Sequence, residues 1–126
     1  MQYLCVVYFE PGTLASLTPS EGDALTRNSL EYDDELRRRG HYLMSNALEP
    51  VGAATTVRVR NGKVLTTDGP FAETKEQLGG FILIEARDLN EAIRVAAGIP
   101  LAKLGSIEVR PIKPLTRADR PAEPRV

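Results

Sequence analysis

The residues best suited to chemistry gather at positions 67–81, which read TDGPFAETKEQLGGF. Asp68 is a candidate general base, or a carboxylate that orients a ligand at a cleft. The alternative is that Asp68 only forms a turn, since aspartate bonds readily to its own backbone two residues on. Glu73 and Lys75 follow in the same loop, where they either hold a polar ligand or keep the loop soluble. The functional hypothesis is a polar site centred on Asp68.

The same stretch has the features of a rigid loop. The Asp-Gly-Pro triplet at 68–70 is a stiff corner, because glycine supplies unusual φ angles and proline restricts both itself and the preceding residue. Phe71 comes next, and burial is favoured for so large an apolar ring, so we expect it to anchor the loop. It is also a candidate wall for a bound ligand. Gly79 and Gly80 allow a β-bulge or a close approach of backbone or ligand.

Three further candidates lie outside this loop. Tyr8 ends an apolar N-terminal run and could line the mouth of a cleft. Arg110 alternates away from its apolar neighbours, so we expect it to face a dimer seam, where arginine commonly bridges carboxylates. His41, the single histidine, is a natural acid–base residue near neutral pH. A position just past a helix C-terminus is also an ordinary structural place for histidine.

We expect no metal and no cofactor. One histidine and one cysteine cannot build a usual zinc site, and the carboxylates lack the spacing of an EF-hand loop. Neither a phosphate-binding loop nor a dinucleotide fingerprint is present. Cys5 lies inside an apolar run, so we interpret it as a small buried hydrophobe rather than a reactive thiol.

Length and charge are typical of one ordinary globular domain. The chain has 126 residues, of which 42% are hydrophobic and 26% are charged. The formal net charge of −1 gives no general reason to bind nucleic acid directly or to bind an anionic membrane. No signal-peptide pattern is found, and no apolar run approaches the ~20 residues that span a bilayer. We therefore expect a cytoplasmic protein.

Apolar periodicity and capping residues predict the elements that must position these side chains. The first helix begins at Thr18, where Glu21 completes a capping box, and ends at Gly40. The second helix runs from Asp88 to about Gly98. Asn61-Gly62 predicts a tight hairpin, because both residues tolerate positive φ. The expected strands are 2–9, 41–48, 54–60, 63–67, 80–86 and 106–112.

This order predicts an α+β fold, a ferredoxin-like β-α-β-β-α-β sandwich with an added β-hairpin. The unbroken apolar runs at 2–9 and 80–86 suit the centre of the sheet, and the alternating run at 106–112 suits an edge. Two helices can cover only one face, whereas the run at 81–84 needs both faces covered. We therefore expect a homodimer in which a second copy covers the open face. We expect the domain to span 1–112 and the Pro-rich, charged stretch 113–126 to be a C-terminal arm.

The run DGPFAETKEQLGG resembles the signature of the YCII-related superfamily, specifically its DGPF-domain branch. The similarity extends over residues 1–112 and includes MQYLCVVYF, TTVRVRNGKVLTTDGPF and GSIEVRPI. The resemblance implies a dimeric α+β barrel, in which two ferredoxin-like sheets face each other and leave a cleft at the edge. Asp68, Glu73 and Lys75 match the charged positions of the motif. Another branch pairs a histidine near the first helix with an aspartate, but residues 18–39 contain no histidine, so that pair does not carry over.

Three functions are compatible with these observations. The first is a small-molecule enzyme of proton-transfer or elimination chemistry on a small organic acid or lactone, with Asp68 as base. Distant dimeric barrels include lactone isomerases, a dehydrochlorinase-like enzyme and monooxygenases. The second is a non-catalytic ligand-binding or regulatory partner linked to transcription, because genes of the DGPF branch often lie beside those of alternative sigma factors. The third is a purely structural dimer.

Overall fold

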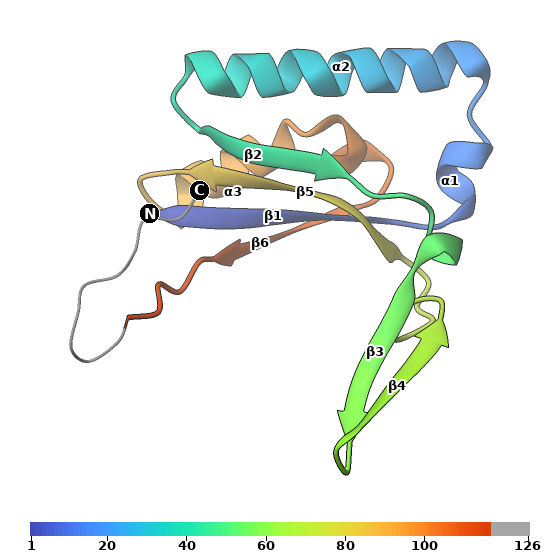
Figure 1. Cartoon of the computed structure of the whole chain (residues 1–126). Helices are drawn as coiled ribbons and strands as arrows, with labels where there is room; N and C mark the ends of the chain where they lie inside the picture. The colour runs from blue at the N-terminus through green and yellow to red at the C-terminus, as the bar shows by residue number, and fades with distance from the viewer. Residues whose placement is uncertain (117–126) are drawn as a thin grey trace.

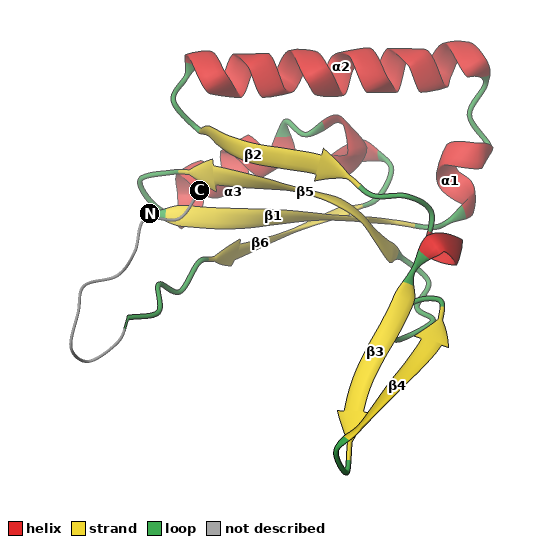
Figure 2. Ribbon diagram, in the orientation of Figure 1, coloured by secondary structure: helices red, strands yellow, loops and turns green. Residues whose placement is uncertain are grey.

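A computed structural model gives the arrangement of the chain and describes residues 1–116 (Figure 1). The C-terminal arm predicted at 113–126 therefore lies mostly outside the described residues. The strands and helices follow one another in the order that the sequence predicts (Figure 2), with three short helical turns added. The elements are β1 Gln2–Phe9, α1 Gly12–Ala15, α2 Pro19–Arg38, β2 Tyr42–Ala47, η1 Val51–Ala53, β3 Thr55–Arg60, β4 Lys63–Asp68, β5 Gln77–Glu85, α3 Leu89–Ala97, η2 Pro100–Lys103 and β6 Ser106–Pro111.

The main sheet has four strands in the order β2-β5-β1-β6, and the pairs β1–β5, β1–β6 and β2–β5 are all antiparallel. The two segments with unbroken apolar runs occupy the centre, and the alternating segment β6 lies at an edge, as predicted. Strand β5 begins at Gln77, earlier than the predicted start at 80. The reason is a bulge at Gly79, after which Leu78 and Gln77 resume pairing with Tyr8 and Phe9.

Both long helices begin and end on the predicted capping residues. At the start of α2 the side chains of Thr18 and Glu21 each accept a hydrogen bond from the other residue's backbone N–H, at 3.1 and 2.9 Å, which completes the capping box. Gly40 ends this helix with a φ of +79°. Asp88 caps α3 by accepting a hydrogen bond from the backbone N–H of Glu91 at 2.9 Å.

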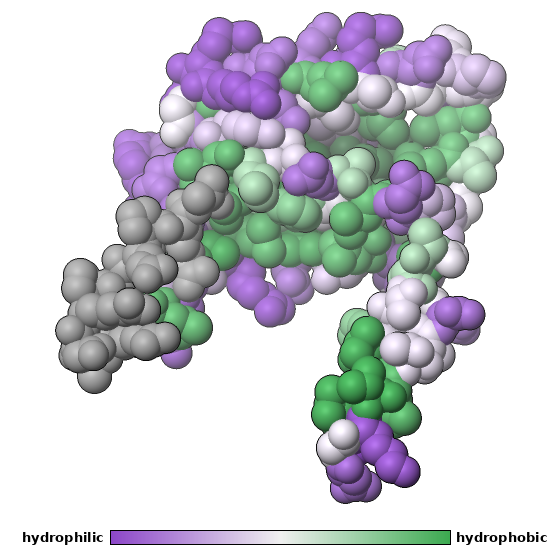
Figure 3. Space-filling view, in the orientation of Figure 1, coloured by the Kyte–Doolittle hydropathy of each residue, from purple (hydrophilic) through white to green (hydrophobic). Residues whose placement is uncertain are grey.

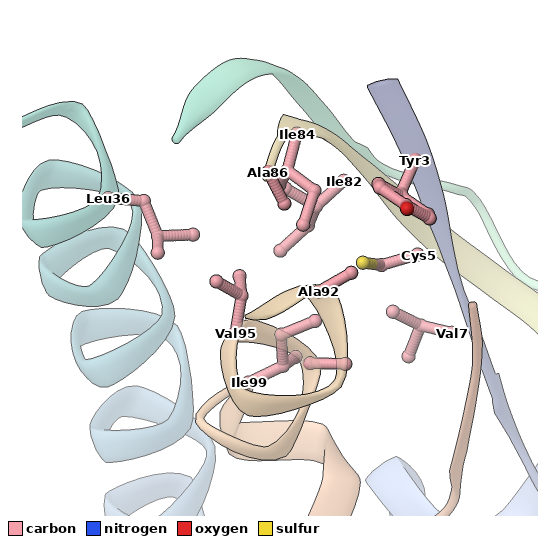
Figure 4. Close-up of a cluster of buried hydrophobic side chains, with 11 residues drawn as sticks. Tyr3, Cys5, Val7, Leu36, Ile82, Ile84, Ala86, Ala92, Val95 and Ile99 are labelled. Carbon is pink, nitrogen blue, oxygen red and sulfur yellow. The ribbon is translucent and has the colours of Figure 1, made fainter. Parts of the chain in front are cut away.

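The core lies between the helices and one face of the sheet (Figure 4). Strand residues at alternate positions point toward the helices, and α2 contributes Leu36 while α3 contributes Val95. Tyr32 of α2 donates its hydroxyl to the backbone carbonyl of Val95 at 2.6 Å, which ties the two helices together. The buried cluster consists of Tyr3, Cys5, Val7, Leu36, Ile82, Ile84, Ala86, Ala92, Val95, Ala96 and Ile99.

Within residues 1–116 no helix covers the other face of the sheet, as predicted. The register places Leu4 opposite Leu83 and Val6 opposite Phe81 across the two central strands. On the neighbouring β2, Met44 pairs with Leu83 and is 37% exposed. Apolar side chains accordingly gather over the strands in Figure 3, below the polar outer surface of α2. We call this surface the open face; its central residues are Leu4, Val6, Phe81, Leu83 and Met44.

Strands β3 and β4 form a separate hairpin that projects away from the main sheet (Figure 1). Its turn is Asn61-Gly62, with φ values of +52° and +74°, which is the predicted conformation. The pairing of Val59 with Val64 places both on one face, where they are 58% and 68% exposed. The hairpin thus presents an apolar surface to solvent in the single chain.

Candidate functional site

The loop between β4 and β5, residues 69–76, is held in shape mainly by its own side chains. Thr74 donates its hydroxyl to the backbone carbonyl of Glu76 at 2.6 Å. The side-chain amide of Gln77 donates to the carbonyls of Ala72 and Thr74 at 3.1 and 3.0 Å. Ser106 of β6 donates to the Glu76 carboxylate at 2.7 Å, which fastens the loop to the edge of the main sheet. Hydrogen bonds within the loop and to β6 therefore hold its shape.

The predicted site residues of this loop are exposed. Asp68 ends β4, and across the described part of the chain its carboxylate takes part in no hydrogen bond or ion pair. The side chain of Lys75 lies 3.5 Å from the Glu10 carboxylate, and Glu73 is exposed. Phe71 is 79% exposed, so the prediction that this ring is buried as an anchor is wrong for the single chain. Backbone and side-chain hydrogen bonds hold the loop instead.

Tyr8 and Arg110 both belong to the open face. The register pairs Tyr8 with Leu78 and with Ser106, so it lies at the end of the sheet that carries the 69–76 loop. Arg110 pairs with Leu4 and forms an ion pair with Glu108 at 3.2 Å. Arg110 therefore faces the surface on which the predicted dimer seam would lie.

His41 lies at the opposite end of the main sheet from this loop. Its Nδ1 is 2.8 Å from the backbone carbonyl of Glu85, so Nδ1 carries the proton and donates. Glu85 ends β5, whereas the loop precedes the start of that strand at Gln77. The nine residues of β5 separate the two places. His41 thus shares no site with Asp68 within one chain.

A cavity of about 410 Å³ lies between α2 and the main sheet. This size is within the usual range for pockets that hold small molecules. Its wall is largely apolar, with Val7, Leu25 and Ile82 among the lining residues. The polar residues of the lining come from α2 and β2: Thr26, Ser29, Tyr32, Asp33, Ser45 and Asn46. An apolar pocket with a few convergent polar groups is the usual form of a small-molecule site.

A chain of hydrogen bonds supports the polar side of this cavity. Ser45 donates its hydroxyl to the Oδ2 atom of Asp33 at 2.8 Å. The hydroxyl of Tyr42 lies 2.9 Å from the same Ser45 oxygen. Because Ser45 has only one proton and gives it to Asp33, Tyr42 must be the donor to Ser45. All three side chains are partly buried, and the chain of donors ends on a carboxylate.

These residues are not predictable from the sequence, because a bulge decides where Ser45 points. Strict alternation along β2 would put Tyr42 and Ser45 on opposite faces. The pairing shifts between Tyr42 and Met44, so Leu43 is an extra residue and Ser45 returns to the helix-covered face. The sequence holds one weak indication of a polar site on α2. Asp33 and Arg37 are one helical turn apart, on the helix face next to the apolar stripe.

Arg37 lies beside the hydrogen-bonded Tyr42, Ser45 and Asp33 but forms no ion pair with Asp33. Its guanidinium lies 4.1 Å from the centre of the Tyr42 ring, a cation–π distance. It also forms an ion pair with Asp34 at 2.6 Å. The ring of Tyr42 is thus fixed from both ends, by Arg37 over its face and by Ser45 at its hydroxyl.

The glycine pair that precedes the apolar run of β5 lies beside the cavity. Gly79 and Gly80 both line it. A Cβ atom on Gly79 would collide with the ring of Phe9, and one on Gly80 would lie 2.9 Å from the backbone oxygen of Asn46. The glycines therefore serve close packing and the bulge, which are the roles predicted for them.

The thiol of Cys5 offers no second reactive centre. Burial raises the pKa of the Cys5 thiol to about 11, so the thiol stays protonated, as expected of a small buried hydrophobe. Among the described residues, no group of three histidine, cysteine or acidic side chains is placed to hold a metal ion. A wider and shallower hollow of about 970 Å³ lies between α2 and the α3–η2 segment.

Comparisons with known proteins place the chain in a family. The sequence pattern described as the YCII-related domain matches residues 1–116. An uncharacterised protein of Rhizobium meliloti (strain 1021) is 34% identical over 114 residues, which cover 89% of this chain and 92% of that protein. No helix within the described residues is long and apolar enough to cross a membrane.

A solved structure shares the fold. It is the 5-chloro-2-hydroxyhydroquinone dehydrochlorinase of Burkholderia phenoliruptrix AC1100 in complex with 2,5-dihydroxybenzoquinone. The match has a TM-score of 0.52 and 19% sequence identity, and it covers 90% of this chain and 94% of the other. At this identity the likeness confirms the α+β, ferredoxin-like architecture.

Proposed function

This chain belongs to the YCII-related domain family, and we propose that it is a small-molecule enzyme of proton-transfer or elimination chemistry. Its ligand, a small organic acid, lactone or hydroxylated ring, occupies the cavity between α2 and the sheet. The observation that carries the proposal is the carboxylate of Asp33 on the wall of an apolar cavity of about 410 Å³. A carboxylate held there by a hydrogen bond can take a proton from a bound molecule while a leaving group departs with its electron pair.

The enzyme of the same fold supports this reaction class by analogy. Its name describes the removal of hydrogen chloride from a hydroxylated ring, a reaction that needs a base and a site for a ring of this size. The cavity supplies both, with Asp33 and Ser45 on one wall and aliphatic side chains on the others.

Asp68 is the rival base. It stands at the end of β4, is exposed and lies outside the residues that line the cavity. In the single chain it lacks the apolar surroundings that tune a carboxylate for proton transfer. A second copy that covers the open face could enclose the 68–78 segment together with Tyr8 and Arg110, and Asp68 would then act at the edge of the dimer.

The dimer itself is part of the proposal. The open face exposes Met44 and Leu78 by 37% and 42%, next to Leu4, Phe81 and Leu83. Soluble proteins commonly cover such a face with a second copy of the same chain. Under two-fold symmetry, Arg110 on one copy can reach acidic groups on the other, since it already lies beside Glu108. Light scattering on the purified protein should give twice the mass of one chain.

The experiment for the reaction uses 5-chloro-2-hydroxyhydroquinone as a trial substrate and measures chloride release above the uncatalysed rate. Ala47 lines the cavity, whereas Ala53 in η1 does not. Ala47→Phe should therefore abolish release, and Ala53→Phe should leave it intact. Asp33→Asn should lower the rate by roughly 10²–10⁴-fold if Asp33 is the base. If Asp68→Asn greatly lowers the rate of chloride release and Asp33→Asn does not, the base is Asp68 in the loop.

Release that persists in Ala47→Phe would show that the cavity is not the site of the reaction. Tight binding of the ring without chloride release, lost in Ala47→Phe, would instead identify a non-catalytic ligand-binding protein.

A further inference from the structure

The hydrogen bonds around Ser45 have a fixed direction. Ser45 gives its proton to Asp33 and receives one from Tyr42, so neither hydroxyl has a proton left for a ligand. Both donor groups are used within the protein. At Asp33 and Ser45 the wall of the cavity therefore offers a bound molecule an acceptor.

The free acceptor is the second oxygen of Asp33. Its Oδ2 atom accepts from Ser45, and within residues 1–116 the Oδ1 atom takes part in no hydrogen bond or ion pair. The nearest arginine on the same helix face, Arg37, is paired with Asp34 and lies over Tyr42. Within residues 1–116 the Asp33 carboxylate is therefore not paired with a cation. A carboxylate oxygen at an apolar wall binds best to a group that donates a proton.

This arrangement also sets the charge of the ligand. The lining beyond Asp33 is uncharged: Leu25, Thr26, Ser29 and Leu30 from α2, with Val7, Ile82 and Leu101 among the rest. Two negative charges that meet at this wall repel each other, because the other lining side chains offer no compensating cation. An ionised acid is disfavoured there, and a neutral hydroxyl is favoured.

On this basis, and resting on the proposed function of the cavity, we infer that the site selects a neutral molecule with a hydroxyl group on a small apolar body. The hydroxyl group of the ligand donates a hydrogen bond to the Oδ1 atom of Asp33. Ser45 and Tyr42 are positioning residues that hold the carboxylate in the orientation that receives it. The preferred class is that of phenols, enols and cyclic alcohols, and their ethers and ionised acids bind more weakly.

The test compares two ring compounds that differ by one donor. 4-Nitrophenol carries a hydroxyl, and 4-nitroanisole carries a methoxy group in its place. Binding of both is measured by calorimetry at a pH below the ionisation of the phenol. Wild-type protein should bind the phenol roughly tenfold to a hundredfold more tightly than the ether, which is the worth of a hydrogen bond to a charged group. Affinity for the phenol should fall as the pH rises through the ionisation of the phenol itself.

Variants assign the effect to the proposed residues. Asp33→Asn should reduce the phenol-to-ether ratio to near one, while Asp23→Asn, the same change at an exposed position of α2, should leave it unchanged. Ser45→Ala should lower the ratio, and Ser45→Thr, which restores a hydroxyl, should recover it. Circular dichroism confirms that each variant is folded.

Equal affinity for both rings in the wild type, with both lost in Ala47→Phe, would overturn this inference and leave the cavity as the ligand site. Binding that Ala47→Phe does not affect, or the absence of binding by either ring, would contradict the proposed function as well. If Asp33→Asn keeps the phenol-to-ether ratio of affinities, the ligand hydroxyl does not bind to Asp33.

Discussion

Two adjacent residues of β5 point to opposite faces of the sheet, one to the core and the other to the proposed dimer seam. Ile82 faces the helices and is 8% exposed, whereas Leu83 is on the open face, between Leu4 and Met44. The same substitution, Ile82→Glu or Leu83→Glu, therefore has two different consequences. The first should unfold the chain, and the second should separate the two copies.

The magnitudes follow from burial. Removing Ile82 from the core forfeits about 1.5–3 kcal/mol of transfer free energy, and placing a glutamate there adds a penalty of a few kcal/mol for the polar group. The sum is a large fraction of the roughly 5–15 kcal/mol that stabilises a domain. The melting temperature should drop by more than about 10 °C. Leu83→Glu should instead raise the dimer dissociation constant by at least about a hundredfold, or 2.8 kcal/mol.

The assay combines light scattering for mass with circular dichroism for folding. Leu89→Glu serves as the control, because Leu89 is 50% exposed at the start of α3 and away from the open face. We expect Leu89→Glu to remain a folded dimer and Leu83→Glu to become a folded monomer. A wild-type monomer at micromolar concentration, or a Leu83→Glu variant that still dimerises, would refute the reasoning about the open face.

Three further predictions concern single side chains. In the Leu83→Glu background, Phe71→Ala should change the free energy of unfolding by less than about 0.5 kcal/mol, because the ring is 79% exposed. Chemical denaturation measures this change, and a loss of ~3 kcal/mol would mean that the ring is buried. Thr18→Ala should cost about 1 kcal/mol by the same measurement, since it removes the cap of α2. The unfolded Cys5 thiol ionises at about its ordinary pKa of 9.0 and the folded one at about 11, so unfolding releases a proton between these values. Wild-type stability should therefore fall relative to Cys5→Ala over that pH range, and a parallel course of the two unfolding curves would contradict the burial of the thiol.

Local signals in the sequence were enough to predict most of the fold. The capping box at Thr18, the tight turn at Asn61-Gly62 and the apolar runs of β1 and β5 each depend on a few neighbouring residues. The order of these elements then determined the topology. The bulge at Gly79 also followed from the glycine pair, although its effect on the start of β5 did not.

The candidate site was harder to predict, because it depends on contacts between distant segments. Ser45 reaches Asp33 only because the pairing of β2 skips Leu43, and nothing in the local sequence marks that shift. The exposure of Phe71 has the same origin. An apolar ring is buried only where some other segment covers it, and no segment within residues 1–116 covers Phe71.

The central claim is that the cavity between α2 and the sheet binds a small molecule. The most direct measurement is a map of backbone amide shifts in the nuclear magnetic resonance spectrum as neutral 4-nitrophenol is added. We expect shifts at Ser45, Ala47 and Gly80 around the cavity, and we expect these shifts to be lost in Ala47→Phe. Shifts confined to residues 68–76, with the cavity amides unmoved, would contradict it.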